Sequence, residues 1–402
     1  MGPRQTFFSL GEVAVSGKTA PGFEPVRRAF ERIVGRGPGG GALTVKLRGE
    51  TVIDLWTGAA DRAGLRPWTP DTLALSFSTT KGVASTVIHR LADRGALEYD
   101  EPVASYWPEF AAGGKARVTV RDLLTHRAGL HSVRAVAERA EDLLDHIALE
   151  DRLAARTVPG PTPRSAYHAI TYGWLVAGLA RRITGRGLAE LTRTEITEPL
   201  GLRGLYIGVP DEARELAAEP VGTALRQLTS TAEATAGLWM RFRPSRTTLD
   251  ALHVPGFHRL FEGKEPPIWR TEMPAVNGVL SARALGQLYE PLANGGKAGD
   301  FVFLSPQTVD ALGRVQVRPA DTVLGLAMRW RLGYHHAFGT GRDAPLAFGH
   351  YGYGGSGGWA DPATGLSVGF VTNRIGSLTT PLGDLNLYRL NRVVRQCLTR
   401  YP

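Results

Sequence analysis

Ser78 and Lys81 have the types and the spacing of a nucleophile and its activating base. They are three positions apart in the segment 71–83, DTLALSFSTTKGV. On a helix, residues i and i+3 lie on the same face, so the lysine amine can reach the serine hydroxyl. A serine hydroxyl is a weak nucleophile at neutral pH and needs a neighbouring base, which a desolvated lysine can supply. The pair therefore indicates acyl transfer through a covalent intermediate on Ser78.

The placement of Ser78 strengthens this interpretation. An extended segment precedes it, and the helical pattern that begins at Lys81 carries an apolar face of Val83, Val87 and Leu91. At a helix start the backbone N–H groups have no partner in the helix and attract negative charge, as an oxyanion donor must. A capping serine beside a solvated lysine is the competing explanation, and the S-x-x-K motif alone does not decide between the two.

A second serine competes for the role of nucleophile. Residues 354–358, GGSGG, fit the G-x-S-x-G pattern of the nucleophile elbow. That elbow requires a helix after the serine and a histidine further along the chain. Ser356 is instead followed by a pattern typical of a strand and a turn, and no histidine follows His350. We therefore predict that Ser356 belongs to a glycine-rich turn.

The elements that must position these residues follow from hydrophobic periodicity and turn signals. Helices are predicted at 23–34, from 81 to the stop at Gly95, within 118–126, and at 170–183, 188–196, 281–293 and 383–398; strands are predicted at 42–47, 51–56, 325–332, 346–350, 357–361 and 366–372. Strands lie near both chain ends and helices in the middle. This order predicts an antiparallel sheet built from the two ends and flanked by the terminal helices, with a mostly helical lobe inserted.

The predicted domains follow from this order. Residues 1–77 and 276–402 would form a discontinuous α/β domain, and residues 78–275 a mostly helical domain, with the catalytic cleft between them. The 402-residue chain is 43% hydrophobic and 21% charged, which is typical of a globular protein. The single cysteine, Cys397, shares a helical face with Leu390 and Val394, so we expect it in the core.

Composition also bears on partners and location. The net charge is +9, but only six of the 47 basic residues are lysines and the arginines are scattered, so we expect no nucleic-acid binding. No apolar run has the length of a signal peptide or a membrane span, which predicts a cytoplasmic protein without membrane contact. The side chains of the adjacent pair His335-His336 should diverge, and His126 and His131 have no carboxylates at ligand spacing. We therefore expect no metal and no cofactor.

Several segments carry a family resemblance beyond the S-x-x-K motif. They are Val120–Leu130 (VRDLLTHRAGL), Glu198–Leu202 (EPLGL) and Asn277–Arg283 (NGVLSAR), and they occur in the family's order. On these the chain resembles the serine β-lactamase and penicillin-binding-protein superfamily, in its class C-like branch, and is most similar to the family VIII carboxylesterases. The resemblance spans roughly residues 25–375. It implies an α+β fold of the β-lactamase/transpeptidase type.

The resemblance also implies further site residues. Tyr167 matches the tyrosine-led second motif and would relay protons to the leaving group, as a phenolate or through a shared proton; Tyr172 is a rival only by its nearness. His350-Tyr351-Gly352 matches the third motif, so His350 would lie beside the Tyr–Lys pair. The backbone N–H groups of Ser78 and Tyr353 would form the oxyanion hole. Gly352 and Trp359 would line the substrate pocket.

One departure from the family pattern bears on the substrate. Ala169 stands where the β-lactamases carry an asparagine that contacts the substrate amide, and His350 replaces a lysine. Both changes favour esters over β-lactams. The sequence thus predicts a serine carboxylesterase for a small-molecule, short-chain acyl ester. The alternatives are a β-lactamase or D-amino-acid peptidase of the same fold, a related amidase or acyltransferase, and a penicillin-recognising protein without turnover. The oligomeric state is not predicted.

Overall fold

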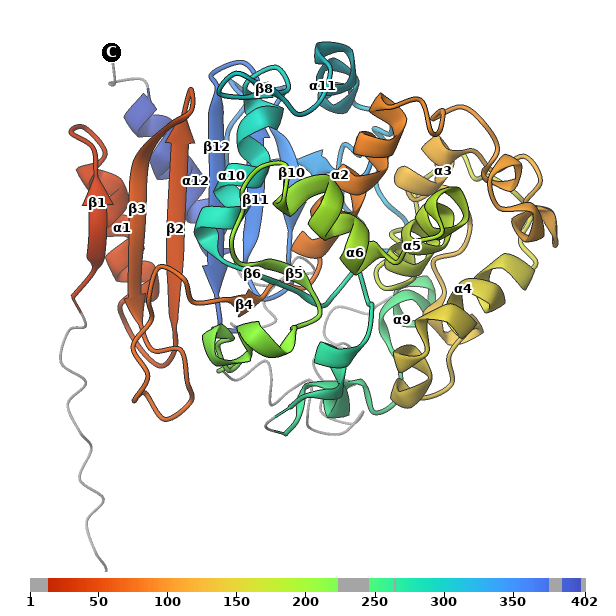
Figure 1. The fold of residues 1–402 in the computed structure, drawn as a ribbon, viewed down its shortest axis with the longest axis horizontal. Helices are drawn as coiled ribbons and strands as arrows, with labels where there is room; N and C mark the ends of the chain where they lie inside the picture. Colours follow the sequence, from red (N-terminus) through yellow and green to blue (C-terminus); the bar gives the residue numbers. More distant parts are fainter. Residues whose placement is uncertain (1–13, 223–245, 264, 376–384, 399–402) are drawn as a thin grey trace, which may run out of the picture.

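A seven-stranded antiparallel sheet forms the left part of the molecule in Figure 1. The computed structural model describes residues 14–222, 246–263, 265–375 and 385–398. The strand order is β1-β3-β2-β12-β11-β10-β9. The bounds are β1 Ser16–Thr19, β2 Gly40–Leu47, β3 Glu50–Gly58, β9 His335–His336, β10 Phe348–Tyr351, β11 Gly357–Asp361 and β12 Leu366–Thr372. The sheet is therefore built from the two ends of the chain, as predicted.

The β2–β3 hairpin shows how local sequence sets the sheet. Leu47 pairs with Glu50, and the two residues between them, Arg48 and Gly49, both have positive φ, 51° and 90°. A two-residue turn with this geometry matches the twist of antiparallel strands. In the centre of the sheet β2 pairs with β12, which joins the N-terminal hairpin to the C-terminal strands.

Helices cover both faces of this sheet. On one face α1 (Glu24–Val34) packs beside α12 (Asn386–Leu398), and their apolar residues share a core with alternate residues of β2, β11 and β12. Cys397 lies in this core, as predicted. On the other face α10 (Ala282–Ala293) crosses β12 and β11. It approaches closely because Gly286 and Gly369 face each other; a Cβ on Gly369 would lie 2.5 Å from the Gly286 nitrogen.

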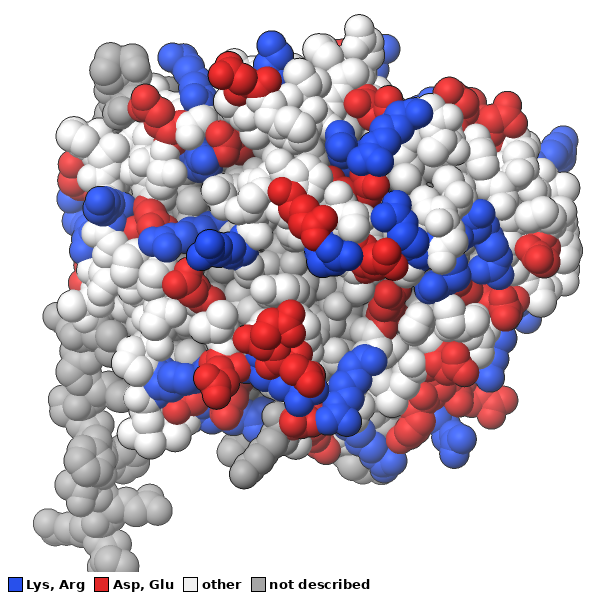
Figure 2. Space-filling model, viewed as in Figure 1, with Lys and Arg blue, Asp and Glu red and all other residues white. Residues whose placement is uncertain are grey.

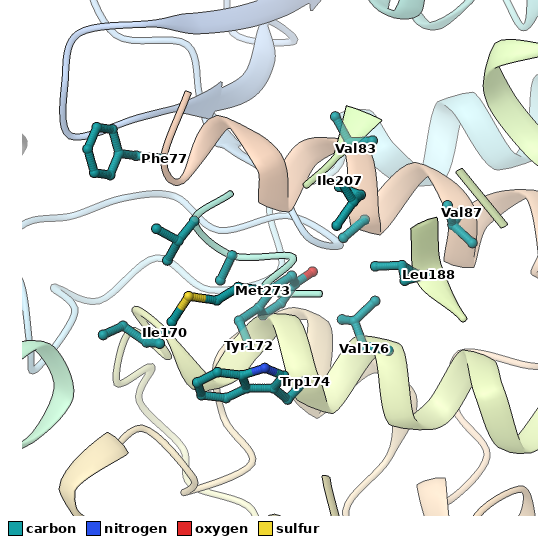
Figure 3. Packing of buried hydrophobic residues seen from close by; sticks show 14 of the residues in the cluster. Phe77, Val83, Val87, Ile170, Tyr172, Trp174, Val176, Leu188, Ile207 and Met273 are labelled. Atoms are coloured by element: carbon teal, nitrogen blue, oxygen red, sulfur yellow. The ribbon is translucent and has the colours of Figure 1, made fainter. Parts of the chain in front are cut away.

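The helical part of the chain packs on the α10 side. Its helices are α2 Thr79–Asp93, α3 Val120–Leu124, α4 His146–Ala155, α5 Thr171–Thr184, α6 Leu188–Thr192 and α9 Arg246–Leu252. Figure 3 shows Val83 of α2 beside Ile207, and Leu188 between Val87 of α2 and Val176 of α5; all belong to one buried cluster. A small sheet, β4-β6-β5, joins segments far apart in the chain: Ala74–Leu75, Gly278–Leu280 and Leu205–Ile207. Among the described residues, the remaining strands and α-helix are β7 Lys297–Ala298, β8 Phe301–Val302 and α11 Pro306–Gly313, and short 3-10 turns connect several elements. The division into two domains stays a prediction.

Two predicted elements differ from the structure. The strand predicted at 325–332 is wrong: this segment is a turn followed by irregular chain, with only Trp330 bridged to Val317. The positive φ of Gly325 and Arg329, 70° and 50°, breaks the extended run. The helix predicted at 188–196 keeps α-helical geometry only to Thr192 and then continues as a π-helical turn, Arg193–Thr197.

Charges of both signs are interspersed on the face shown in Figure 2, where Lys and Arg alternate with Asp and Glu. Many arginines pair locally with carboxylates, for example Arg181 with Glu150 and Arg395 with Asp361. This pairing agrees with the scattered arginines of the sequence. Within the described ranges, no helix is both long and apolar enough to cross a membrane.

Candidate active site

Ser78 lies where an extended segment turns sharply into α2. β4 ends at Leu75, and Phe77 takes a positive φ of 46° before Ser78 begins the helix as its N-cap. The Phe77 carbonyl accepts hydrogen bonds from the Thr80 N–H, at 2.9 Å, and from the Thr80 hydroxyl. The Ser78 side chain does not cap the helix and is half-buried among buried neighbours. Its Oγ is therefore available for chemistry.

Lys81 points its amine at this oxygen. The side chain is fully buried, and its Nζ lies 3.0 Å from Ser78 Oγ, 2.6 Å from the Ala169 carbonyl oxygen and 3.1 Å from the Ala275 carbonyl oxygen. Carbonyl oxygens only accept hydrogen bonds, so the two carbonyls take two N–H bonds of the amine. A neutral amine then has its lone pair left for the third direction, toward the Ser78 hydroxyl.

The burial of Lys81 favours this neutral form. Desolvation holds the pKa of Lys81 well below the ordinary lysine value. Among the described residues, no carboxylate pairs with the amine to oppose this shift. A neutral amine that faces a hydroxyl can accept its proton. The geometry thus suits Lys81 to the role of general base, which the sequence had predicted.

Tyr167 lies beside both Ser78 and Lys81. The Lys81 Nζ is 5.0 Å from the centre of the Tyr167 ring, and the phenol interacts with the Ser78 side chain. Burial raises the pKa of Tyr167 above its ordinary value, the Ser78 hydrogen bond opposes this shift, and the charge of Asp321 adds to it. Of the two forms predicted from the sequence, the raised pKa favours the protonated phenol over the phenolate. A protonated phenol can donate its proton.

The rival tyrosine is bound elsewhere. The Tyr172 hydroxyl lies 2.7 Å from the Ser85 hydroxyl, one turn further along α2 than Lys81. Both groups are buried. The backbone at 169 has a role of its own, since the Ala169 carbonyl is one of the two that orient the Lys81 amine.

His350, on β10, completes the group. Its ring centre is 6.4 Å from that of Tyr167 and 4.8 Å from that of His335. Burial, His335 and Lys81 lower the pKa of His350 well below the usual value, so the ring is neutral. Nδ1 lies 3.2 Å from the Tyr351 carbonyl oxygen and must carry the proton to bond it. Nε2 is then an acceptor, and it is buried with no hydrogen-bond partner among the described residues.

The predicted oxyanion donors come from two segments that contact each other. The turn between β10 and β11 is tied to the start of α2, because the Thr79 hydroxyl donates to the Ser356 carbonyl at 3.0 Å. Gly352 makes this contact possible: a Cβ there would lie 2.1 Å from the Ser76 carbonyl oxygen. Within the described residues, neither the Ser78 N–H nor the Tyr353 N–H donates to another backbone carbonyl. Both remain available to a ligand.

Two sequence predictions for the substrate pocket need correction. Trp359 is fully buried in the core under α12, where its indole N–H donates to Asn391 at 2.8 Å. It pairs with Gly349, so strand alternation puts it on the opposite face of the sheet from His350. Trp359 as a pocket wall is therefore wrong. Gly352 is buried against Ser76 and Thr79, so it shapes the turn by close packing.

Ser356 lies in a turn, as predicted. Its hydroxyl accepts from the Thr372 N–H at 3.1 Å, and the chain continues directly into strand β11. No helix follows it, so the elbow geometry is absent at this serine.

The sequence reasoning missed an aromatic and histidine cluster behind Tyr167. Trp330 stacks on the Tyr167 ring with centroids 5.4 Å apart, and His126 lies 4.3 Å from Trp330 and 5.0 Å from Tyr167. His126 accepts from the His168 N–H through Nδ1, and burial lowers the pKa of His168 to about 3. We had considered His126 only as a metal ligand. Its position within the family-like segment Val120–Leu130 was the available signal.

No group of three or more His, Cys, Asp or Glu side chains is arranged to hold a metal ion within the part of the chain that the structure describes. The candidate site consists of the Ser78 hydroxyl, the Lys81 amine, the Tyr167 phenol, the His350 imidazole and the backbone N–H groups of Ser78 and Tyr353.

Comparison with known proteins places this site in a family. The family described as beta-lactamase matches residues 26–389. The chain belongs to the β-lactamase family. The predicted superfamily and its fold are therefore confirmed, and they account for the sheet built from both chain ends and for the S-x-x-K pair at the start of α2.

Individual members of the β-lactamase family are similar over nearly the whole chain. Esterase/beta-lactamase LipL of Mycobacterium tuberculosis is 44% identical over 386 residues, covering 94% of this chain and 88% of the relative. A solved family VIII carboxylesterase is 34% identical, with a TM-score of 0.83 over 96% of this chain and 100% of that one. A penicillin-binding-protein homologue from Caulobacter crescentus is 33% identical, with a TM-score of 0.82 and the same coverage.

Proposed function

We propose that this protein is a serine carboxylesterase that hydrolyses small acyl esters through an acyl-enzyme on Ser78. The observation that carries the proposal is the Lys81 amine, which two carbonyls orient so that its lone pair faces Ser78 Oγ. The similarity to an esterase/beta-lactamase and to a family VIII carboxylesterase supports the same class of reaction.

In the acylation step, Ser78 Oγ attacks the ester carbonyl carbon while its proton passes to Lys81 Nζ. The carbonyl oxygen becomes negative and accepts hydrogen bonds from the Ser78 and Tyr353 N–H groups, a kind of stabilisation worth about 3 kcal/mol per donor in serine hydrolases. The C–O bond to the alcohol then breaks. Tyr167 donates its proton to the departing alkoxide and regains one from the Lys81 ammonium, so the free alcohol leaves and the amine is neutral again.

Deacylation repeats these steps with water as the nucleophile. Water adds to the acyl carbon, its proton passes to the Tyr167–Lys81 pair, and Ser78 leaves with a proton returned from that pair. His350 offers its unpartnered Nε2 as an acceptor beside Tyr167, where a hydroxyl of the substrate alcohol or the attacking water could donate to it.

Two features support an ester before a β-lactam. Ala169 has no side-chain amide to bind a substrate amide, and its carbonyl is already used by Lys81. His350 is neutral, so it offers no positive charge to a β-lactam carboxylate. The name of the Mycobacterium tuberculosis relative includes both activities, so β-lactam hydrolysis is the second candidate. The cytoplasmic location stays a prediction.

The test compares p-nitrophenyl acyl esters of increasing chain length with a chromogenic cephalosporin. We expect ester turnover by the native protein, a preference for short chains, and no turnover by Ser78→Ala. Ser356→Ala is the matched control and should retain turnover. Ester hydrolysis that survives Ser78→Ala would overturn the proposal. Cephalosporin turnover equal to ester turnover would replace the esterase by the β-lactamase, and labelling of Ser78 without turnover would indicate a binding protein.

A further inference from the structure

Asp321 is a buried carboxylate far from Tyr167 in the sequence. It begins a turn after α11, in which its N–H donates to the Leu326 carbonyl at 2.9 Å and its carbonyl accepts from the Gly325 N–H at 2.8 Å. Its Oδ1 also accepts from the N–H groups of Val323, at 2.9 Å, and Leu324, at 3.1 Å. These bonds alone would make Asp321 an ordinary turn residue.

The same carboxylate, however, has two further bonds that lead to Tyr167. Oδ1 accepts from the Tyr167 N–H at 3.1 Å, and Oδ2 accepts from the Trp330 indole N–H at 3.1 Å. Trp330 in turn stacks on the Tyr167 ring, with an angle of 16° between the ring planes. One side chain thus holds both the backbone of the tyrosine and the aromatic ring that covers it.

The partners of Asp321 explain why a carboxylate stands there. All four are N–H donors, and both oxygens are used, so the side chain must accept at both ends. An asparagine has one oxygen and one NH2 group, and either orientation would direct a donor at a donor. Asp321 is 1% exposed, and no cation pairs with it in an ion pair among the described residues. Its charge is therefore balanced by N–H dipoles and acts on its surroundings at close range.

That charge acts on the phenol. The negative carboxylate makes ionisation of the Tyr167 hydroxyl less favourable and so raises its pKa, in the same direction as burial does. A phenol that stays protonated until the alkoxide forms is the proton donor that the leaving group needs.

We propose that Asp321 is a positioning residue for Tyr167, which holds the phenol through its backbone and through Trp330 in place for proton delivery to the leaving alkoxide. The proposal rests on the proposed ester hydrolysis. In this proposal Asp321, which lies in the irregular segment 321–334, helps to hold the catalytic groups in position. Asp321 touches no reacting atom.

The experiment uses two esters with the same acyl group and different alcohols. A p-nitrophenolate leaves without a proton, whereas an ethoxide needs one, so only the ethyl ester depends strongly on a proton from Tyr167. We expect Asp321→Asn to lower kcat/KM for the ethyl ester about tenfold more than for the p-nitrophenyl ester. Because the charge near the phenol is lost, the alkaline limb of the kcat/KM profile should also move to lower pH.

Trp330→Phe is the second variant, which keeps a ring on Tyr167 and the charge of Asp321 but removes the indole N–H. It should lower the ethyl-to-p-nitrophenyl ratio by a smaller factor and leave the alkaline limb in place. If Asp321→Asn does not fold, Trp330→Phe still allows the ratio of kcat/KM for the two esters to be measured. Asp93→Asn is the matched control, since Asp93 is a carboxylate that accepts from the Ser305 N–H and the Thr308 hydroxyl near α11. It should leave the ratio unchanged.

Equal losses for both esters in Asp321→Asn and Trp330→Phe, with an unmoved alkaline limb, would show that Asp321 only stabilises the fold and would overturn the proposal. Failure of the proposed function is distinguishable, because it is read from the native protein and Ser78→Ala. In that case the native protein would hydrolyse neither ester, or Ser78→Ala would hydrolyse both.

Discussion

The buried amine of Lys81 has a thermodynamic consequence that can be measured without a substrate. In the unfolded chain a lysine binds a proton below a pH of about 10.4. In the folded protein desolvation holds the Lys81 pKa well below this value, so the amine stays neutral over a range of pH in which the unfolded chain is protonated. The unfolded state then binds more protons, and the stability of the native protein rises with pH in that range.

The magnitude follows from linkage. Each pH unit between the folded and the unfolded pKa of Lys81 changes the free energy of unfolding by about 1.4 kcal/mol. Lys81→Met removes the contribution. It also leaves the Ala169 and Ala275 carbonyls without their donor, a loss that does not depend on pH. The stability of Lys81→Met relative to the native protein should therefore improve as the pH falls from 9 to 7, by up to about 1.4 kcal/mol per pH unit.

The assay is urea unfolding of both proteins at pH 7, 8 and 9. Lys297→Met is the control, because the Lys297 side chain is exposed whereas that of Lys81 is buried. Its stability relative to the native protein should not change with pH. If the difference between Lys81→Met and the native protein is equally independent of pH, the amine is protonated in the folded protein. Lys81 would then not be the base, and the reasoning from its three contacts would fail.

Three further predictions concern the neighbours of this amine. Tyr167→Phe keeps the ring stacked on Trp330 but removes the proton donor. We expect kcat/KM for the ethyl ester to fall at least about 100-fold, with an unchanged near-UV circular dichroism spectrum. A loss below tenfold would contradict the role of the phenol. Gly352→Ala would place a Cβ 2.1 Å from the Ser76 carbonyl oxygen and so push the turn that carries Tyr353 away from Ser78. Ester turnover should therefore fall more than tenfold. Native-like turnover would show that Tyr353 is no oxyanion donor. Ser356→Ala removes the acceptor of the buried Thr372 N–H, so the free energy of unfolding in urea should fall by about 1–3 kcal/mol. Ester turnover should stay within about threefold of the native value. Abolished turnover in a folded variant would make Ser356 the candidate nucleophile again.

Much of the chemistry was present in the sequence because it depends on local spacing. Ser78 and Lys81 are one helical turn apart, so any helix that begins at Thr79 brings their side chains together. Hydrophobic alternation and glycine turns likewise predicted strands β11 and β12 at the bounds that the structure has. These features require only contacts between near neighbours.

Tertiary structure decided the rest, because it brings distant segments together and removes water. The lowered pKa of Lys81 depends on burial, and the direction of its amine depends on carbonyls 88 and 194 positions away in the chain. Trp359 follows the third motif closely in sequence, yet strand alternation directs it into the opposite core. Asp321 lies in no recognisable sequence motif, and the segment around Trp330, which supports Tyr167, was wrongly predicted as a strand. The sequence by itself determined the spacing of Ser78 and Lys81, the predicted nucleophile and base, because that spacing is local. Only the folded chain decided the burial of these groups and the contacts of Asp321 and Trp330 around Tyr167, because those contacts join distant segments.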